Sequence, residues 1–157
     1  MSARLNLFDS PVAGKAMKYL ASAGKVFGGA SVSEVTQELV SLRTSQINGC
    51  GMCVDIHTKH LAAAGEPAQR INMVAAWREA TVYTEAERAA LELAEQGTRI
   101  ADAAGGVPDE VWANAAKHYD DDQLAVLVSL IALMNTMNRL NVMVRQPAGA
   151  YEVGQFA

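Results

Sequence analysis

Apolar residues recur along this chain at helical spacing, and no segment alternates polar and apolar residues as a half-buried strand would. The segment after residue 33 is typical, with apolar side chains at Val35, Leu39, Val40 and Leu42. We therefore expect an all-α fold of about six to eight helices. The expected helices cover residues 11–23, 34–46, 50–65, 67–77, 84–100, 108–118 and a long segment that begins at 121.

Polar residues and glycines indicate where these helices begin and end. Two pairs have the capping-box spacing of Ser or Thr followed three positions later by Glu, namely Ser31 with Glu34 and Thr84 with Glu87. Asp121 is the expected cap of the last helix. Asn48 and Gly49 form a turn signal, which should end one helix just before the next begins near residue 50. The tail after Pro147 is expected to be extended or loose.

The composition is that of a folded globular protein, with 157 residues, 50% of them hydrophobic and 19% charged. We expect a single domain over residues 1–157. The net charge of −4 and the lack of any Lys/Arg-rich block argue against nucleic acid or an anionic membrane as a partner. The longest apolar stretch, 124–134, is shorter than the ~20 residues of a membrane span, and no signal peptide is evident. A cytoplasmic protein is expected.

Cys50 and Cys53 are the only two cysteines, and His57 follows the second by four residues. In a cytoplasmic protein such a pair is more often catalytic or metal-binding than structural. If a helix begins here, both thiols lie on one face within reach of a disulfide. The free N–H groups and the positive dipole end of the first turn favour a thiolate. Dithiol redox chemistry is therefore the first hypothesis.

The distances along the helix suggest different roles for the two thiols. His57 is one turn from Cys53 but seven residues, or about 10 Å of axial rise, from Cys50. We expect Cys53 to attack a peroxide. Cys50, expected to be the more exposed thiol, would resolve the sulfenic acid and exchange with an external reductant. The carboxylate that orients His57 is expected to be Glu38 on the preceding helix, if that helix folds back, because Asp55 points elsewhere.

These residues resemble the AhpD-like alkylhydroperoxidase branch of the carboxymuconolactone decarboxylase family. Its peroxidase members carry a glutamate, eleven residues, and then Cys-x-x-Cys-x-x-x-His. Glu38, Cys50, Cys53 and His57 match all four positions. The resemblance extends over residues 34–144, with further similar runs at 42–50, 57–60, 76–79, 84–91, 107–109 and 135–140.

The resemblance implies an all-helical homo-oligomer, often a trimer or a hexamer, that reduces hydroperoxides without haem, flavin or metal. No cofactor is therefore expected, and the implied partners are a hydroperoxide substrate and an external dithiol reductant. Glu38 and His57 would form a proton relay to Cys53. Some members place a second relay histidine between the cysteines, where this chain has Met52. Members that decarboxylate carboxymuconolactone typically lack the cysteine pair, which argues against that activity here.

Other interpretations of the same residues are open at this point. Zinc could be held by Cys50, Cys53, His57 and His60, although four ligands on one short helix enclose an ion poorly. The cysteines could also be buried packing residues. His60 is otherwise expected at the surface. A structural network or a subunit interface is expected for Asn135, Asn138 and Arg139.

Two further functions compete with the peroxidase. With Met52 at the relay position, a general thiol–disulfide oxidoreductase or redox sensor would use the same cysteines but react slowly with peroxide. The chain could instead be a non-catalytic helical binding oligomer.

Overall fold

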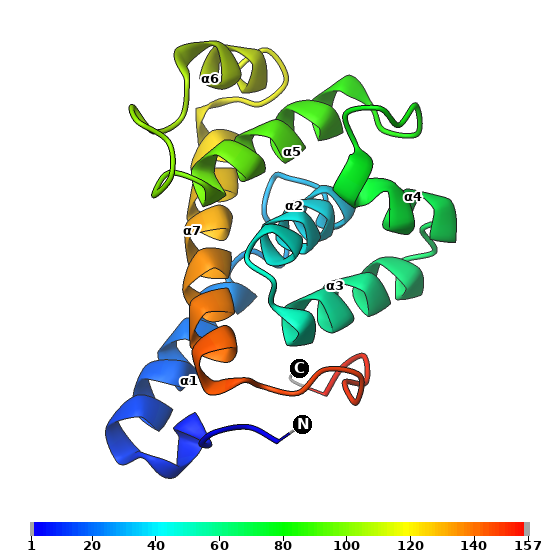
Figure 1. The fold of residues 1–157 in the computed structure, drawn as a ribbon. Helices are drawn as coiled ribbons and strands as arrows, with labels where there is room; N and C mark the ends of the chain where they lie inside the picture. The colour runs from blue at the N-terminus through cyan, green and yellow to red at the C-terminus, as the bar shows by residue number, and fades with distance from the viewer. Residues whose placement is uncertain (1, 156–157) are drawn as a thin grey trace.

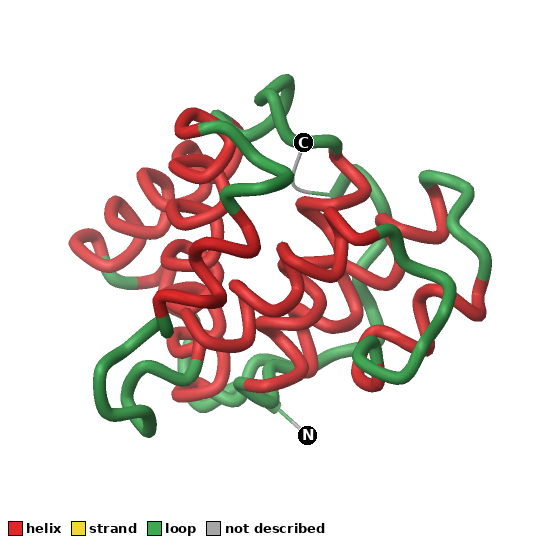
Figure 2. The backbone as a smooth tube through the Cα atoms, turned by 90° about the horizontal axis from the view of Figure 1, so that it is seen from above, coloured by secondary structure: helices red, strands yellow, loops and turns green. Residues whose placement is uncertain are grey.

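The computed structural model describes residues 2–155, and in that range it contains helices, turns and loops but no strand (Figures 1 and 2). Each helix expected from the sequence has a counterpart, which confirms the all-α fold. The elements are η1 (Leu7–Asp9), α1 (Pro11–Lys25), α2 (Glu34–Ile47), α3 (Gly51–Ala63), α4 (Ala68–Met73), η2 (Val74–Ala76), α5 (Glu85–Thr98), α6 (Asp109–Ala115) and α7 (Asp121–Val144).

Helix α2 is the central element, and α3, α5 and α7 all pack against it (Figure 1). One cluster of buried side chains joins α2, α5 and α7 and contains both Cys50 and Cys53. A second cluster joins α2 and α5 to α3, α4 and η2, around Leu61 and Trp77. The cysteines are therefore part of the main apolar core, which holds them in place at the start of α3.

The link between α2 and α3 is a tight turn at Asn48 and Gly49, as the sequence predicts. Gly49 has a φ of +67°, a conformation that residues with a side chain rarely adopt. Its N–H donates to the carbonyl of Gln46, and the N–H of Cys50 donates to the carbonyl of Ser45. These bonds satisfy the last carbonyls of α2 and fold α3 back along it.

Two of the expected helix caps are wrong by one or two residues. Ser33, not Ser31, caps α2, and its hydroxyl accepts a bond from the N–H of Thr36. Ser31 instead donates to Asp122 at 2.8 Å, a contact between distant parts of the chain. Asp120, not Asp121, caps α7 and forms a capping box with Gln123. Several residues with capping side chains are adjacent at both sites, and tertiary packing selects among them. The capping box of Thr84 and Glu87 is confirmed.

Helix α7 packs its apolar stripe onto the core as expected, through Leu124, Leu127, Leu130, Ile131 and Met134. Among the residues described it is also the one helix whose length and apolar composition would suit a membrane span, with a mean hydropathy of 1.3 over eighteen residues. The apolar stretch 124–134 alone is too short for a span, whereas an eighteen-residue window of α7 also includes neighbouring apolar residues. Core helices of water-soluble proteins share these properties, and α7 packs against α2 and α5.

A buried carboxylate at Glu95 joins α5 to α2 and to the segment after η2. It accepts hydrogen bonds from Arg43, from the indole N–H of Trp77 at 3.0 Å, and from Arg78 at 3.0 Å. Burial raises the pKa of Glu95. The hydrogen bond from Trp77 and the hydrogen bond and charge of Arg43 together lower it by more than burial raises it, so that the net pKa lies below its ordinary value. The ionised form is the one that the fold stabilises.

Stability is therefore expected to depend on the protonation of Glu95. Because the folded pKa is depressed, its contribution is present at neutral pH and is lost as the pH falls below 4.5 through the folded pKa. Glu95→Gln should lower the free energy of unfolding by about 3 kcal/mol at neutral pH, with a smaller difference from the wild type in acid. Denaturant unfolding of both proteins over a pH series measures this. A difference that is constant with pH would contradict the assignment.

Candidate active site

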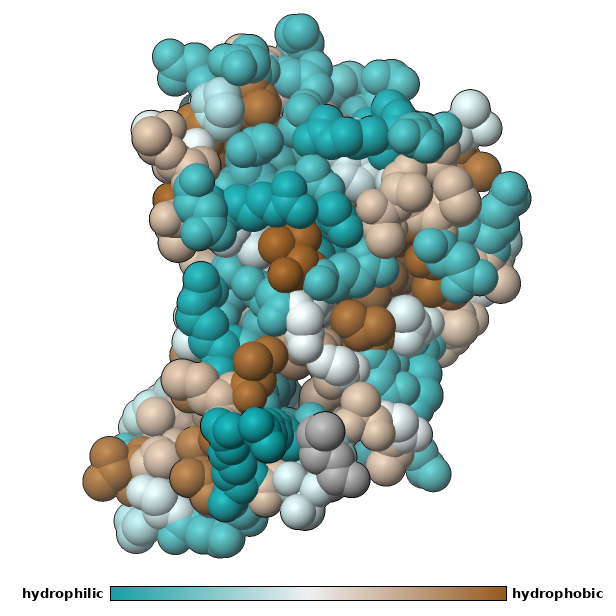
Figure 3. Space-filling model, viewed as in Figure 1, coloured by the Kyte–Doolittle hydropathy of each residue, from teal (hydrophilic) through white to brown (hydrophobic). Residues whose placement is uncertain are grey.

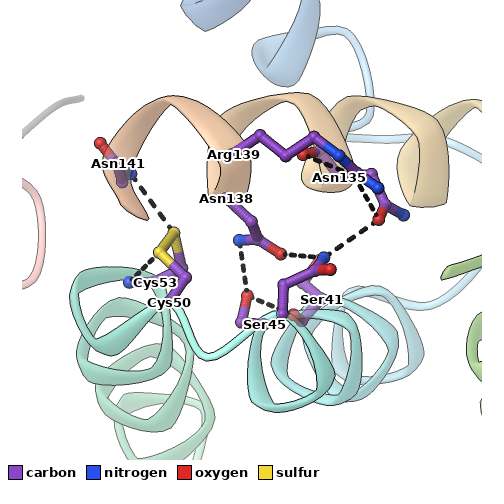
Figure 4. The surroundings of a disulfide bond; sticks show 9 residues. Ser41, Ser45, Cys50, Cys53, Asn135, Asn138, Arg139 and Asn141 are labelled. Carbon is purple, nitrogen blue, oxygen red and sulfur yellow. Dashed lines mark hydrogen bonds between the residues drawn. A yellow bond between two sulfur atoms is a disulfide. The ribbon is translucent and has the colours of Figure 1, made fainter. Parts of the chain in front are cut away.

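Cys50 and Cys53 are joined in a disulfide at the start of α3, with their Cα atoms 5.4 Å apart (Figure 4). Cys50 is the N-cap residue of α3, and its sulfur accepts a bond from the N–H of Cys53 at 3.4 Å. The first turn of α3 thus places one sulfur at the cap and the other in the helix. The Cα separation lies in the range of disulfides, and the Cys-x-x-Cys spacing suits reversible dithiol chemistry.

The expectation that Cys50 is the more exposed thiol is wrong. Only 1% of Cys50 and 3% of Cys53 are accessible in the single chain. The reason is the tight α2–α3 turn, which pulls the N-cap residue into the main core cluster instead of leaving it at an open helix end. Met52, at the position of the absent relay histidine, also packs against this cluster.

Asn141 on α7 contacts the disulfide directly. Its side-chain amide donates to the sulfur of Cys53 at 3.3 Å (Figure 4). Asn141 was not among the residues expected at the site, although Asn138 and Asn141 follow Asn135 at intervals of three along one helix. Such spacing of amides places them on one face, which is a signal that polar groups meet there. A donor at this position stabilises negative charge on Cys53 sulfur.

The remaining amides form a buried network that fixes the turn before the cysteines. The side-chain amide of Asn48 donates to Asn135 and to Asn138 at 3.0 Å each. The fully buried Asn138 donates in turn to the hydroxyl of Ser45 at 3.1 Å (Figure 4). The structural network expected for these asparagines is therefore present, and it ties α7 to the end of α2.

Glu38 on α2 lies against two histidines of α3. Its Oε2 is 2.7 Å from Nδ1 of His57, and its Oε1 is 3.2 Å from Nδ1 of His60. The structure thus brings Glu38 and His57 together as the sequence predicts. It corrects the expectation for His60, which is half-buried and hydrogen-bonded at both nitrogens, with Nε2 2.7 Å from the hydroxyl of Tyr151. Local sequence patterns do not indicate the contact between His60 and Tyr151, because these residues lie far apart in the chain.

The charge of Glu38 is set by these neighbours. Burial raises the pKa of Glu38, whereas the hydrogen bond and charge of His57 lower it, and His60 lowers it further, so that the net pKa lies below 4.5. Glu38 is thus an anion at neutral pH. Because the carboxylate holds Nδ1 of His57, a proton from Cys53 would be taken up at Nε2. His57 follows Cys53 by one turn of α3, which is the spacing of side-chain neighbours.

The C-terminal segment is pinned across α3. Asp55 accepts a bond from the N–H of Gly149 at 2.8 Å, and Lys59 donates to the carbonyl of Tyr151 at 2.7 Å. Tyr151 is itself buried. Asp55 therefore points away from His57, as expected, and accepts hydrogen bonds from the backbone of the C-terminal segment. The tail is not loose as far as Tyr151, because Asp55 and Lys59 of α3 bind the backbone of Gly149 and Tyr151, and residues 153–155 form a turn.

A cavity of about 620 Å³ opens beside Cys50. The end of α7 and the start of the tail form its far wall. Its lining residues are Gly49, Cys50, Gly51, Asn141, Val142, Arg145, Gln146, Pro147 and Ala148. A small molecule in this cavity would approach the disulfide from the Cys50 side.

A helical fold with a cysteine pair at the start of one helix and a Glu–His pair between two helices defines an AhpD-like protein. Residues 14–96 match the sequence profile of the carboxymuconolactone decarboxylase family, and the chain belongs to this family. It is 37% identical to the uncharacterized protein YdfG of Bacillus subtilis over 142 residues, which are 90% of this chain and 94% of YdfG. The alkyl hydroperoxide reductase AhpD of Bradyrhizobium diazoefficiens is 46% identical over 46 residues, 29% of this chain and 25% of that protein.

Solved structures place the fold in the same group. A protein of unknown function from Agrobacterium tumefaciens, ATU0492, superposes with a TM-score of 0.87 at 32% identity, over 96% of this chain and all of that one. The debrominase Bmp8 superposes with a TM-score of 0.73 at 20% identity, over 87% of this chain and 74% of Bmp8. The similarity to Bmp8 concerns the fold alone. The catalytic roles of Glu38, Cys50, Cys53 and His57 stay a prediction.

Proposed function

We propose that this protein is a thiol-dependent peroxidase that reduces organic hydroperoxides or hydrogen peroxide. The observation that carries the proposal is the 2.7 Å contact between Glu38 and His57, one helical turn from a cysteine pair that can close as a disulfide. A carboxylate–imidazole pair beside a thiol is the arrangement that activates a sulfur nucleophile. The short AhpD match and the family membership support the same activity.

The proposed cycle begins from the reduced cysteines. His57 takes the proton of Cys53 at Nε2, and Glu38 stabilises the resulting imidazolium through Nδ1. The Cys53 thiolate attacks a peroxide oxygen, the O–O bond breaks, and the departing oxygen receives the proton from His57 as an alcohol or water. Cys53 is left as a sulfenic acid. Asn141, which donates to this sulfur, would stabilise the thiolate before attack.

Cys50 completes the cycle. Its sulfur attacks that of Cys53, the S–O bond breaks, and water leaves as the disulfide forms. An external dithiol then attacks the disulfide and leaves as its own disulfide, which returns both cysteines to thiols. The cavity beside Cys50 is the proposed point of entry for this reductant. Because both cysteines are buried, the entry step is expected to need movement of residues 146–148 of the cavity wall.

Stopped-flow oxidation of the reduced protein by a panel of hydroperoxides tests the proposal. Each mole of chain should consume one mole of peroxide and form the disulfide, with organic hydroperoxides and hydrogen peroxide ranked by rate. The competing oxidoreductase function is favoured by the apolar packing of Met52, which leaves the site without a second relay group. If peroxide leaves the cysteines reduced while a small disulfide oxidises them rapidly, that function replaces the peroxidase.

A homo-oligomer stays a prediction, and exposed apolar side chains support it. Val12 and Tyr19 on α1, Val26 at the C-cap of α1, and Met143 on α7 are exposed in the single chain. Hydrophobic atoms gather at the lower left of Figure 3, where Figure 1 places η1 and α1. Self-association would cover this surface, and a molar mass of one chain by light scattering would contradict it.

A further inference from the structure

Glu38, His57 and His60 form a cluster of possible metal ligands at the interface of α2 and α3. One donor atom from each residue can be chosen so that all three lie within 4.8 Å of one another. The carboxylate oxygens are 2.7 and 3.2 Å from the two Nδ1 atoms. Ligands about 2.1 Å from one ion lie roughly 3–3.5 Å from each other. The cluster is therefore close to the size that a single ion requires.

The chemistry of the three ligands suits a transition metal ion. Two imidazoles and one carboxylate bind Zn²⁺ in many sites, whereas Ca²⁺ and Mg²⁺ prefer oxygen ligands. His57 and His60 lie three residues apart on one face of α3, and Glu38 faces them from α2.

The surroundings also suit an ion. The side chains of His57, Glu38 and His60 are 12%, 25% and 32% accessible, which lets an ion enter and lets water complete its coordination. If Nδ1 of His60 binds the metal, its Nε2–H donates to the hydroxyl of Tyr151 at 2.7 Å. Such an outer hydrogen bond fixes the orientation of a metal-binding histidine and strengthens it as a ligand.

We infer that this cluster is a binding site for one Zn²⁺-like divalent transition metal ion, formed by Glu38, His57 and His60. The site differs from a zinc site made by the cysteines, because both sulfurs are joined in the disulfide. Metal binding at Nδ1 places the proton of His57 on Nε2. His57 then cannot accept a proton from Cys53, so the ion would inhibit peroxide reduction, a consequence that rests on the proposed function.

Titration calorimetry of the oxidised protein with ZnCl₂ at neutral pH tests the site without any need for activity. The wild type should bind one Zn²⁺ per chain and should not bind Mg²⁺ in the same range. His60→Asn should weaken Zn²⁺ binding by at least about a hundredfold, and Tyr151→Phe, which keeps all three ligands, by about tenfold. His118→Asn changes the third histidine of the chain, which lies outside the cluster, and should have no effect.

Circular dichroism of each variant shows whether the helices are intact. The inference is overturned if the wild type does not bind Zn²⁺, or if His60→Asn binds it as tightly as the wild type. It is also overturned if His118→Asn loses binding. A second arm measures inhibition of peroxide reduction by Zn²⁺. Zn²⁺ binding by a protein that does not consume peroxide would disprove the proposed function and leave the metal site standing.

Discussion

Replacing Cys53 with serine is expected to reduce peroxide consumption by at least about a thousandfold while the helical fold is retained. A serine hydroxyl is not ionised near neutral pH and cannot form a sulfenic acid, so the first chemical step is lost. Serine is close to cysteine in size, and the site already offers a donor from Asn141, so little packing is disturbed. Stopped-flow peroxide consumption and circular dichroism measure the two effects.

Cys50→Ser is the matched control for this experiment. Its Cys53 should still be oxidised once by peroxide, but no disulfide can form, and turnover with an external dithiol should stop. A sulfenic acid trapped on Cys53 and identified by mass spectrometry is the expected product. Serine is a good N-cap residue, so the bond that Cys50 accepts from the N–H of Cys53 is preserved. If Cys53→Ser still consumes one equivalent of peroxide and Cys50→Ser does not, the roles of the two thiols are reversed.

The helices could be predicted from the sequence because their signals are local. The periodic apolar residues and the turn signal at Gly49 can be recognised from neighbouring positions in the sequence. They predict α2, α3 and the turn that folds α3 back along α2. The contact of Glu38 with His57 follows from that fold once the turn is tight. The cap of α2 could not be predicted to the residue, because Ser31 and Ser33 carry the same side chain and Ser31 is engaged by Asp122 from a distant part of the chain.

The tail contacts and the particular partners of the asparagines could not be predicted in this way. The bonds of Asp55 with Gly149 and of His60 with Tyr151 join positions more than ninety residues apart, and no local pattern encodes them. The burial of Cys50 likewise depends on the packing of its side chain into the core cluster with residues of α5 and α7, which are distant in the sequence. Asn141 was within reach of sequence reasoning, since its spacing from Asn138 matches one helical face, but its target on α3 was not.

Glu38→Gln is expected to slow the oxidation of Cys53 by about a hundredfold, the size of a general-base contribution. Glutamine has nearly the volume of glutamate, and its amide oxygen can still accept a bond from Nδ1 of His57. What it lacks is the negative charge that stabilises the imidazolium form. The fold should be retained, because the side chain sits half-buried at a helix interface where an amide can be accommodated. The rate is measured by stopped flow under excess peroxide.

Glu34→Gln is the control, because it makes the same substitution on the same helix. Glu34 lies in the first turn of α2, a full turn before Glu38, and should leave the oxidation rate within about twofold of the wild type. His57→Asn should reproduce the loss seen in Glu38→Gln, and the double variant should be little worse than either single one. Two residues that act as one relay are not additive, whereas independent effects would multiply. A multiplicative loss would mean that Glu38 supports the site by its charge alone and not through His57.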